Sequence, residues 1–147
     1  MARDDHHGIN DQFKASQHRR DDAQVLFHGA RWRASMYLGG YAVECLLKAR
    51  LMKRYGVRTL ADLDQDLKSR GLIAGEATVY SHEIEWLFRI TGDQARIRSD
   101  RDAWKAYVTV NRWGPEWRYD PDLSGREEAE DFLDALDRVL SWLRAHP

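Results

Sequence analysis

The stretch YLGGYAVECLLKARLMKRYG, residues 37–56, decides the fold of this chain. Its apolar residues spread around most of a helical circumference, which is typical of a helix that is buried nearly all round. Gly39 and Gly40 interrupt this run, although each glycine costs up to about 1 kcal/mol of helix propensity relative to alanine. We therefore expect a central helix, residues 31–55, ended by Gly56. The two glycines are expected to mark a tight helix crossing, within the bundle or across a dimer.

A carboxylate in the middle of this helix needs a partner. Buried Glu44 must be paired, hydrogen-bonded or protonated. Lys48 follows four residues later, which is the favourable order for an ion pair on a helix, and His82 is a second candidate partner. We expect a satisfied core network that fixes helix register, with a catalytic carboxylate as the alternative. The single cysteine, Cys45, is expected to be a small buried apolar residue, because no Cys–His–Asn pattern surrounds it.

Length and composition indicate one soluble globular domain. The chain has 147 residues, of which 43% are hydrophobic and 32% charged, and these are ordinary values for such proteins. Its formal net charge of −1 gives no overall field toward nucleic acid or an anionic membrane. A single cysteine excludes an internal disulfide framework and suits a reducing compartment. The polar start MARDDHHGINDQ does not resemble a signal peptide, so we expect a cytoplasmic protein.

The pattern along the chain is helical throughout. No alternating apolar and polar run is long enough for a strand. All three prolines lie at or after Pro115, so the strongest helix breaker is absent from the first 114 residues. We expect a flexible N-terminus at residues 1–10. Residues 11–147 are then expected to form one all-α domain, an up-and-down bundle of four long helices plus a short helix.

Short signals place the helix ends. Thr59 followed by Asp62 predicts the start of the short helix. Ser81 is a good N-cap for the fourth helix, and Ser124 with Glu127 fits a capping box for the last one. The helices expected besides the central one are residues 11–30, 59–69, 81–91 and 93–113, and a terminal helix after 124.

Two segments resemble a known family. RASMYLGGYAVECLLKARL (33–51) and YSHEIEWLF (80–88) are similar to the central helix and a later helix of HEPN-domain proteins, named for higher-eukaryote and prokaryote nucleotide-binding. The upstream, middle and terminal helices fit the family's order, so the resemblance covers roughly residues 11–144. It implies a helical bundle, usually a homodimer, in prokaryotic proteins. These often act beside a small nucleotidyltransferase in toxin–antitoxin or phage-defence settings.

Many members of this family are metal-independent ribonucleases, with an arginine followed by four to six residues and a histidine. The histidine serves as general acid or base, and the arginine stabilises charge on phosphorus. No histidine of this chain has an arginine at that distance before it. The resemblance therefore implies a non-catalytic member that binds a nucleotidyltransferase-type protein, a nucleotide or RNA. The alternative is a ribonuclease with an atypical active site made from Glu44, His82 and one of Arg96, Arg98 or Arg101.

The segment WKAYVTVNRWGPEWRY, residues 104–119, interleaves aromatic and cationic side chains. Such side chains can stack on unpaired bases, but they can equally anchor an irregular segment or an interface. Packing is the favoured interpretation. If a ligand or interface site exists, we expect it here and near the carboxylate of the central helix. Its candidate residues are Tyr41, Glu44, Lys48, His82, Trp113 and Trp117.

Charge is uneven along the chain. Residues 48–58 contain five basic residues and no acid, whereas the 28 residues from Asp120 hold eight acids against three bases. This polarity suits RNA binding at one end or pairing of opposite patches, although a solvated helix end is the simpler reading. The histidines lack partners at metal-ligand spacing, and no glycine-rich phosphate loop is present. We expect neither a metal nor a cofactor. The five basic residues are Lys48, Arg50, Lys53, Arg54 and Arg58.

Overall fold

The computed structural model describes residues 8–120 and 124–147, and over these ranges the fold is all-helical, with no β-strand. Three helices are long, with 20 or 24 residues, and the other four have ten or fewer. This differs from the expected four long helices plus one. The elements are α2 (Ile9–His28), α3 (Trp32–Tyr55), α4 (Leu60–Ser69), α5 (Ile84–Thr91), α6 (Asp93–Arg98), α7 (Arg101–Val110), the 3₁₀ helix η1 (Pro115–Tyr119) and α8 (Arg126–Ala145).

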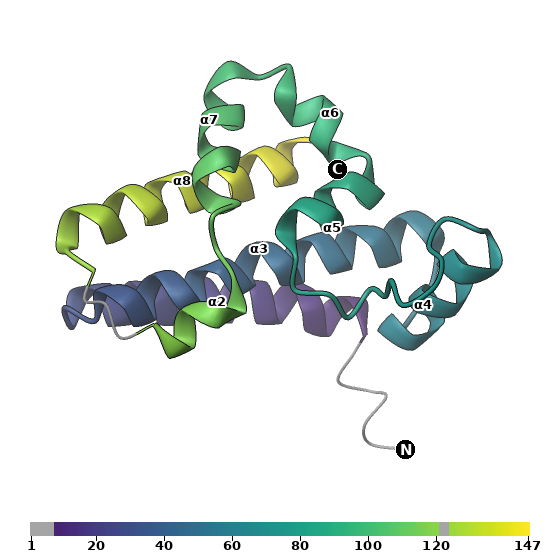
Figure 1. Cartoon of the computed structure of the whole chain (residues 1–147), viewed down its shortest axis with the longest axis horizontal. Coiled ribbons are helices and arrows are strands. Elements are labelled where there is room, and N and C mark those ends of the chain that lie inside the picture. Colours follow the sequence, from purple (N-terminus) through teal and green to yellow (C-terminus); the bar gives the residue numbers. More distant parts are fainter. Residues whose placement is uncertain (1–7, 121–123) are drawn as a thin grey trace.

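Helix α3 is the central element, as its sequence predicts. It packs against α2, α4, α5, η1 and α8. Figure 1 shows α2 running alongside it, with α8 and the α5–α7 segment on its other side. Gly56 ends the helix in the left-handed conformation, with φ 65°, which glycine adopts without strain. The apolar residues of α3 that are buried are Met36, Ala42, Val43, Leu46, Leu47, Ala49, Leu51 and Met52.

Helices α2 and α3 form a hairpin that is joined by two buried hydroxyl groups. Ser16 Oγ donates to the carbonyl oxygen of Ala42 at 2.6 Å. Ser35 Oγ donates to the carbonyl oxygen of Ala23, also at 2.6 Å. Because each hydroxyl has a partner, burying it carries no desolvation penalty for an unpaired group. These two bonds hold the hairpin in one register.

The two glycines of α3 serve different neighbours. A methyl group on Gly39 would lie 3.0 Å from a δ-carbon of Leu136, so this glycine lets α8 approach closely, as expected. A methyl group on Gly40 would overlap the indole of Trp113. That indole donates from Nε1 to the carbonyl oxygen of Tyr37 at 2.9 Å. Gly40 is therefore a seat for a tryptophan side chain, and not the crossing point of two helices.

Two expected helix starts are wrong. Helix α5 begins at Ile84, and the Ser81 hydroxyl accepts from the backbone N–H of Glu83 in the preceding turn. Helix α8 has Gly125 at its N-cap. The Ser124 hydroxyl is buried without a hydrogen-bond partner among the described residues, so no capping box forms there.

One expected helix is divided in two. Residues 93–113 form α6 and α7, because the carboxylate of Asp100 accepts from the backbone N–H of Ala103 at 3.1 Å and starts a new helix. The predicted start of α4 is confirmed: the Thr59 hydroxyl accepts from the N–H of Asp62 at 3.1 Å.

The expected flexible segment falls largely on residues 1–7, which lie outside the described residues, and α2 already begins at Ile9. Across the described ranges, no helix combines the length and the apolar character needed to cross a bilayer.

Candidate functional site

Glu44 lies at the centre of a buried ion-pair network. Its side chain is 6% exposed, and the side chain of Lys48 is equally buried. Oε2 of Glu44 accepts a hydrogen bond from Lys48 Nζ at 3.2 Å. Its other oxygen, Oε1, lies 2.6 Å from Nδ1 of His82. Both partners predicted from the sequence therefore contact this carboxylate. Since each oxygen has a donor, the buried charge is compensated.

His82 is the exposed end of this network. It lies just before α5, and half of its side chain (50%) is exposed. An ionised carboxylate can only accept hydrogen bonds, so Nδ1 is the donor toward Glu44. In the neutral imidazole this leaves Nε2 as an acceptor on the solvent side. A carboxylate that orients a histidine in this way is a common device for proton transfer.

Tyr41 covers the histidine on its other side. Its ring centroid lies 6.0 Å from that of His82 and 4.8 Å from that of Trp113. Its hydroxyl lies 3.2 Å from the hydroxyl of Tyr37. Burial raises the pKa of Tyr41, and Tyr37 acts in the same direction, whereas Arg118 acts to lower it. The phenol of Tyr41 therefore stays neutral at pH 7.

Trp113 and Trp117 have packing contacts. Trp113 is 5% exposed. The ring of Trp117 packs at 5.5 Å from Phe132, and the guanidinium of Arg33 lies 5.0 Å from its centroid. Arg33 also pairs with Asp120 at 3.4 Å. These contacts of Trp117 attach η1 to α3 and α8.

Cys45 lies beside the same carboxylate. Burial raises the pKa of its thiol to about 11, and the negative charge of Glu44 contributes. A thiol with such a pKa carries little thiolate at neutral pH, so it is a poor nucleophile.

The three arginines considered for an atypical active site are placed elsewhere. Arg96 lies 3.4 Å from Asp93, and Arg98 lies 5.2 Å above the ring of Trp104. Arg101 is exposed at the start of α7. Within the described part of the chain, no hydrogen bond or ion pair joins any of them to Glu44 or His82.

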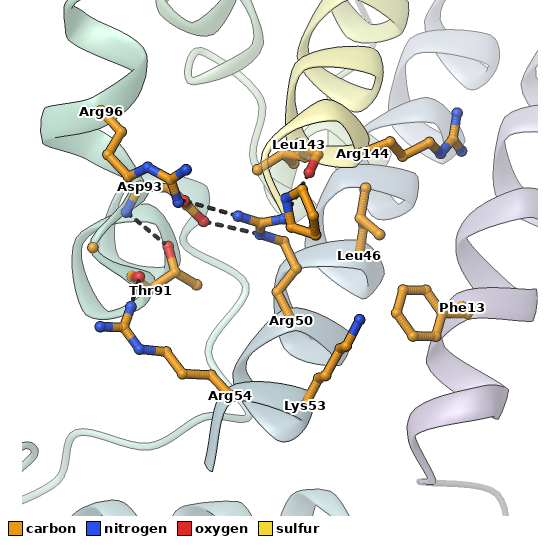
Figure 2. Close-up of a pocket in the computed structure, with 12 residues that line it drawn as sticks. Phe13, Leu46, Arg50, Lys53, Arg54, Thr91, Asp93, Arg96, Leu143 and Arg144 are labelled. Atoms are coloured by element: carbon orange, nitrogen blue, oxygen red, sulfur yellow. Dashed lines mark hydrogen bonds and ion pairs between the residues drawn. The ribbon is translucent and has the colours of Figure 1, made fainter. Parts of the chain in front are cut away.

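The largest feature that sequence reasoning missed is a cavity of about 670 Å³, which we call the basic pocket (Figure 2). Helices α2, α3 and α8 and the α5–α6 junction contribute to it. Five of its lining side chains are cationic and only one is acidic. Its lining residues are Phe13, Leu46, Arg50, Lys53, Arg54, Thr91, Gly92, Asp93, Arg96, Leu143, Arg144 and Pro147.

Arg50 fixes the shape of the basic pocket. Its Nε and Nη2 donate to the two carboxylate oxygens of Asp93, at 2.9 and 2.8 Å. Its Nη1 and Nη2 also donate to the backbone carbonyls of Leu143 and His146, both at 2.7 Å. Asp93 is 1% exposed. The one acidic side chain among these lining residues is thus already neutralised by a bidentate partner.

Three other cations of the pocket have no ion pair with a described residue. Arg54 donates to the carbonyl oxygen of Thr91, which is an uncharged acceptor. Lys53 and Arg144 are exposed and have no ion pair with any described residue. The pocket therefore carries a net positive charge and suits an anionic ligand.

Part of this pocket is visible in the sequence. The basic run at residues 48–58 contains Arg50, Lys53 and Arg54, but Arg96 and Arg144 come from distant segments.

No group of three or more potential metal ligands occurs in the described residues.

Comparison with known proteins leaves the family unassigned. No family model matches the chain, and neither the curated proteins nor the solved structures include a match. The HEPN resemblance therefore stays a prediction.

Proposed function

We propose that this chain is a non-catalytic, HEPN-like binding protein that binds the phosphate of a nucleotide or RNA in the basic pocket. The observation that carries the proposal is the charge of that pocket, where five cations face one acid that is already paired with Arg50. Phosphate groups favour such arginine- and lysine-rich sites. We also propose that the helices form an up-and-down HEPN-like bundle and that the protein is a homodimer. Both points are based on the resemblance of residues 33–51 and 80–88 to HEPN-domain proteins.

The Glu44 network has a structural role that requires no catalysis. Both of its oxygens are occupied by donors within the chain, and burial raises the pKa of the thiol beside it, which makes that thiol a poor nucleophile at neutral pH. A satisfied buried network of this kind fixes helix register. A nucleotidyltransferase-type partner in a toxin–antitoxin or defence setting remains part of the proposal through the family resemblance alone.

The test is a binding measurement with charge-matched variants. Two probes are used, a labelled nucleotide and a labelled single-stranded 12-mer RNA. Each probe is titrated with the wild type, with the double variant Lys53→Ala/Arg144→Ala and with the control double variant Lys105→Ala/Arg112→Ala, and binding is followed by fluorescence anisotropy. Both doubles lose one lysine and one arginine, but the control residues do not line the pocket. We expect binding of at least one probe to weaken about tenfold or more only in the pocket double. Equal loss in both doubles would contradict a pocket site.

A ribonuclease is the second candidate, and one observation favours it. His82 is half exposed while its Nδ1 is held by the buried carboxylate of Glu44. This is the geometry of a general base that takes a proton at Nε2. The arginines expected to assist lie elsewhere, and the cation that contacts this pair is Lys48, at 3.2 Å from Glu44.

A cleavage assay decides between the two. The wild type, Glu44→Gln, His82→Ala and the exposed-histidine control His18→Ala are incubated with RNA in a metal chelator. The binding proposal predicts no cleavage above a protein-free blank for any of them. Cleavage that persists in His18→Ala but disappears in His82→Ala and Glu44→Gln, with unchanged circular dichroism, would establish the ribonuclease instead.

A further inference from the structure

The basic pocket combines its charge with an apolar wall. The apolar residues Phe13, Leu46 and Pro147 line the same cavity as the cations. Phe13 is 39% exposed, so its ring is available at the surface of α2. Hydrated anions gain nothing from such a wall, because burying apolar surface is favourable only when the ligand brings apolar surface of its own. The pocket therefore fits a ligand with two chemically different ends.

The cations of the pocket divide into two groups. Arg50 and Arg54 are fixed by bonds to Asp93 and to backbone carbonyls, and Arg96 lies near the same carboxylate. They form a rigid positive wall. Lys53 and Arg144 have no such bond to any described residue, and Figure 2 shows Phe13 and Leu46 lying between them. These two side chains are free to bind a ligand's anionic group, and the apolar wall is next to both.

The size of the cavity limits the ligand to one small molecule. About 670 Å³ lies within the range of small-molecule pockets, which are commonly lined by apolar side chains with a few polar groups that fix orientation. Its wall is also held before any ligand arrives, since Arg50 ties α3 to α6 and to the end of α8. Preorganised walls reduce the ordering cost of binding.

We propose that the basic pocket binds one small phosphate monoester with an apolar or aromatic body. The phosphate pairs with Lys53, and the body packs against Phe13 and Leu46. This inference rests on the proposed function and narrows it, because it excludes an extended RNA strand as the main ligand. The monoester is either a nucleoside monophosphate or an alkyl phosphate, and both present the same chemistry to the pocket.

Calorimetric titration of the full chain tests the inference with named probes. These are inorganic phosphate, adenosine, adenosine monophosphate, hexyl phosphate and a 12-mer RNA without a terminal phosphate. We expect at least one of the two monoesters to bind at least tenfold more tightly than inorganic phosphate, adenosine and the RNA. Preference for adenosine monophosphate identifies the nucleotide source, and preference for hexyl phosphate identifies the alkyl source.

Three variants locate the site. Lys53→Ala should weaken monoester binding about tenfold, whereas the control Lys105→Ala should not. Phe13→Ala should weaken the monoester but leave inorganic phosphate unchanged, which a purely electrostatic site would not show. All of these residues are exposed, so folding is expected to survive, and circular dichroism checks it.

Different failures are distinguishable. If the 12-mer RNA binds more tightly than every monoester and Lys53→Ala weakens it, the proposed function stands and this inference is overturned. If a monoester binds but none of the pocket variants changes its affinity, the assigned site is wrong. If no phosphate-bearing probe binds, both proposals fall.

Discussion

Gly40 of α3 occupies a position where any side chain would displace Trp113. A methyl group there would overlap the indole, which is buried and hydrogen-bonded to the carbonyl of Tyr37. We predict that Gly40→Ala lowers the free energy of unfolding by about 3 kcal/mol, because overpacking outweighs the gain of up to about 1 kcal/mol in helix propensity. Urea unfolding followed by circular dichroism at 222 nm measures the change.

Gly39→Ala is the matched control for that prediction. Its methyl group would meet the ends of leucine side chains of α8 at 3.0 and 3.3 Å, and these can rotate. We expect a change within about 1 kcal/mol in either direction. Equal midpoints for Gly40→Ala and the wild type would show that Trp113 is not seated on Gly40.

At the scale of single residues, contacts are predictable from the sequence where the partner is close along the chain. Lys48 lies four residues from Glu44, so helix geometry alone predicts that contact. The pair of Arg50 and Asp93 spans 43 residues, and no local pattern indicates it. The indole of Trp113 against Gly40 is a similar case, because a glycine in a helix shows that something approaches closely but does not identify it.

At the scale of elements, Asp64 attaches helix α4 to the loop that carries His82. Its carboxylate accepts from Lys68 at 2.6 Å, from the Thr78 hydroxyl at 2.8 Å and from the N–H of Val79 at 3.0 Å. Burial acts to raise the pKa of Asp64, but these hydrogen bonds outweigh it and lower the pKa. The folded state therefore favours the charged form.

The pH dependence follows from this direction. A lowered folded pKa contributes stability above the unfolded value of about 3.9, and that stability is lost as pH falls through the folded pKa. We predict that Asp64→Asn is destabilised by about 1 kcal/mol at pH 7 and that the difference from wild type shrinks by pH 3. Urea midpoints at both pH values measure it, with exposed Glu76→Gln as control. A difference that is as large at pH 3 as at pH 7 would refute this role.

Element ends were predictable where a single residue supplies the bond. Thr59 and Gly56 act as their sequence indicates. Ser81 and Ser124 carry equally good capping signals, yet neither caps a helix, because Ser81 stabilises a turn instead. The break at Asp100 had a usable signal, since aspartate is a strong N-cap, but the apolar pattern on either side of it suggested one continuous helix.

For the whole molecule, the basic pocket was beyond local reasoning because it assembles residues from both ends of the chain. Phe13 and Arg144 meet only after α2 and α8 have packed on α3. The fold class was predictable from local patterns. The sequence has no long alternation of apolar and polar residues and no proline before Pro115, and both features indicate an all-helical chain. The relative lengths of the helices were not predicted, because they depend on caps and packing between distant segments.

Arg50 holds these distant segments together. One guanidinium bonds to Asp93 of α6 and to the carbonyls of Leu143 and His146 at the end of α8. Arg50→Met would leave the carboxylate of Asp93, which is 1% exposed, with only Arg96 at 3.4 Å. We predict a loss of about 3 kcal/mol in the free energy of unfolding, as is typical when one partner of a buried ion pair is removed.

A double-mutant cycle separates this ion pair from general damage. If the pair is the cause, Arg50→Met/Asp93→Leu loses clearly less stability than the sum of its two single variants. Arg89→Met is the control, because its ion pair with Glu85 is exposed and should contribute under about 0.5 kcal/mol. Chemical unfolding of all five proteins gives the values. If the stability losses of the two single variants add up to that of the double variant, the ion pair with Asp93 contributes nothing measurable. Arg50 would then stabilise the fold through its bonds to the α8 carbonyls alone.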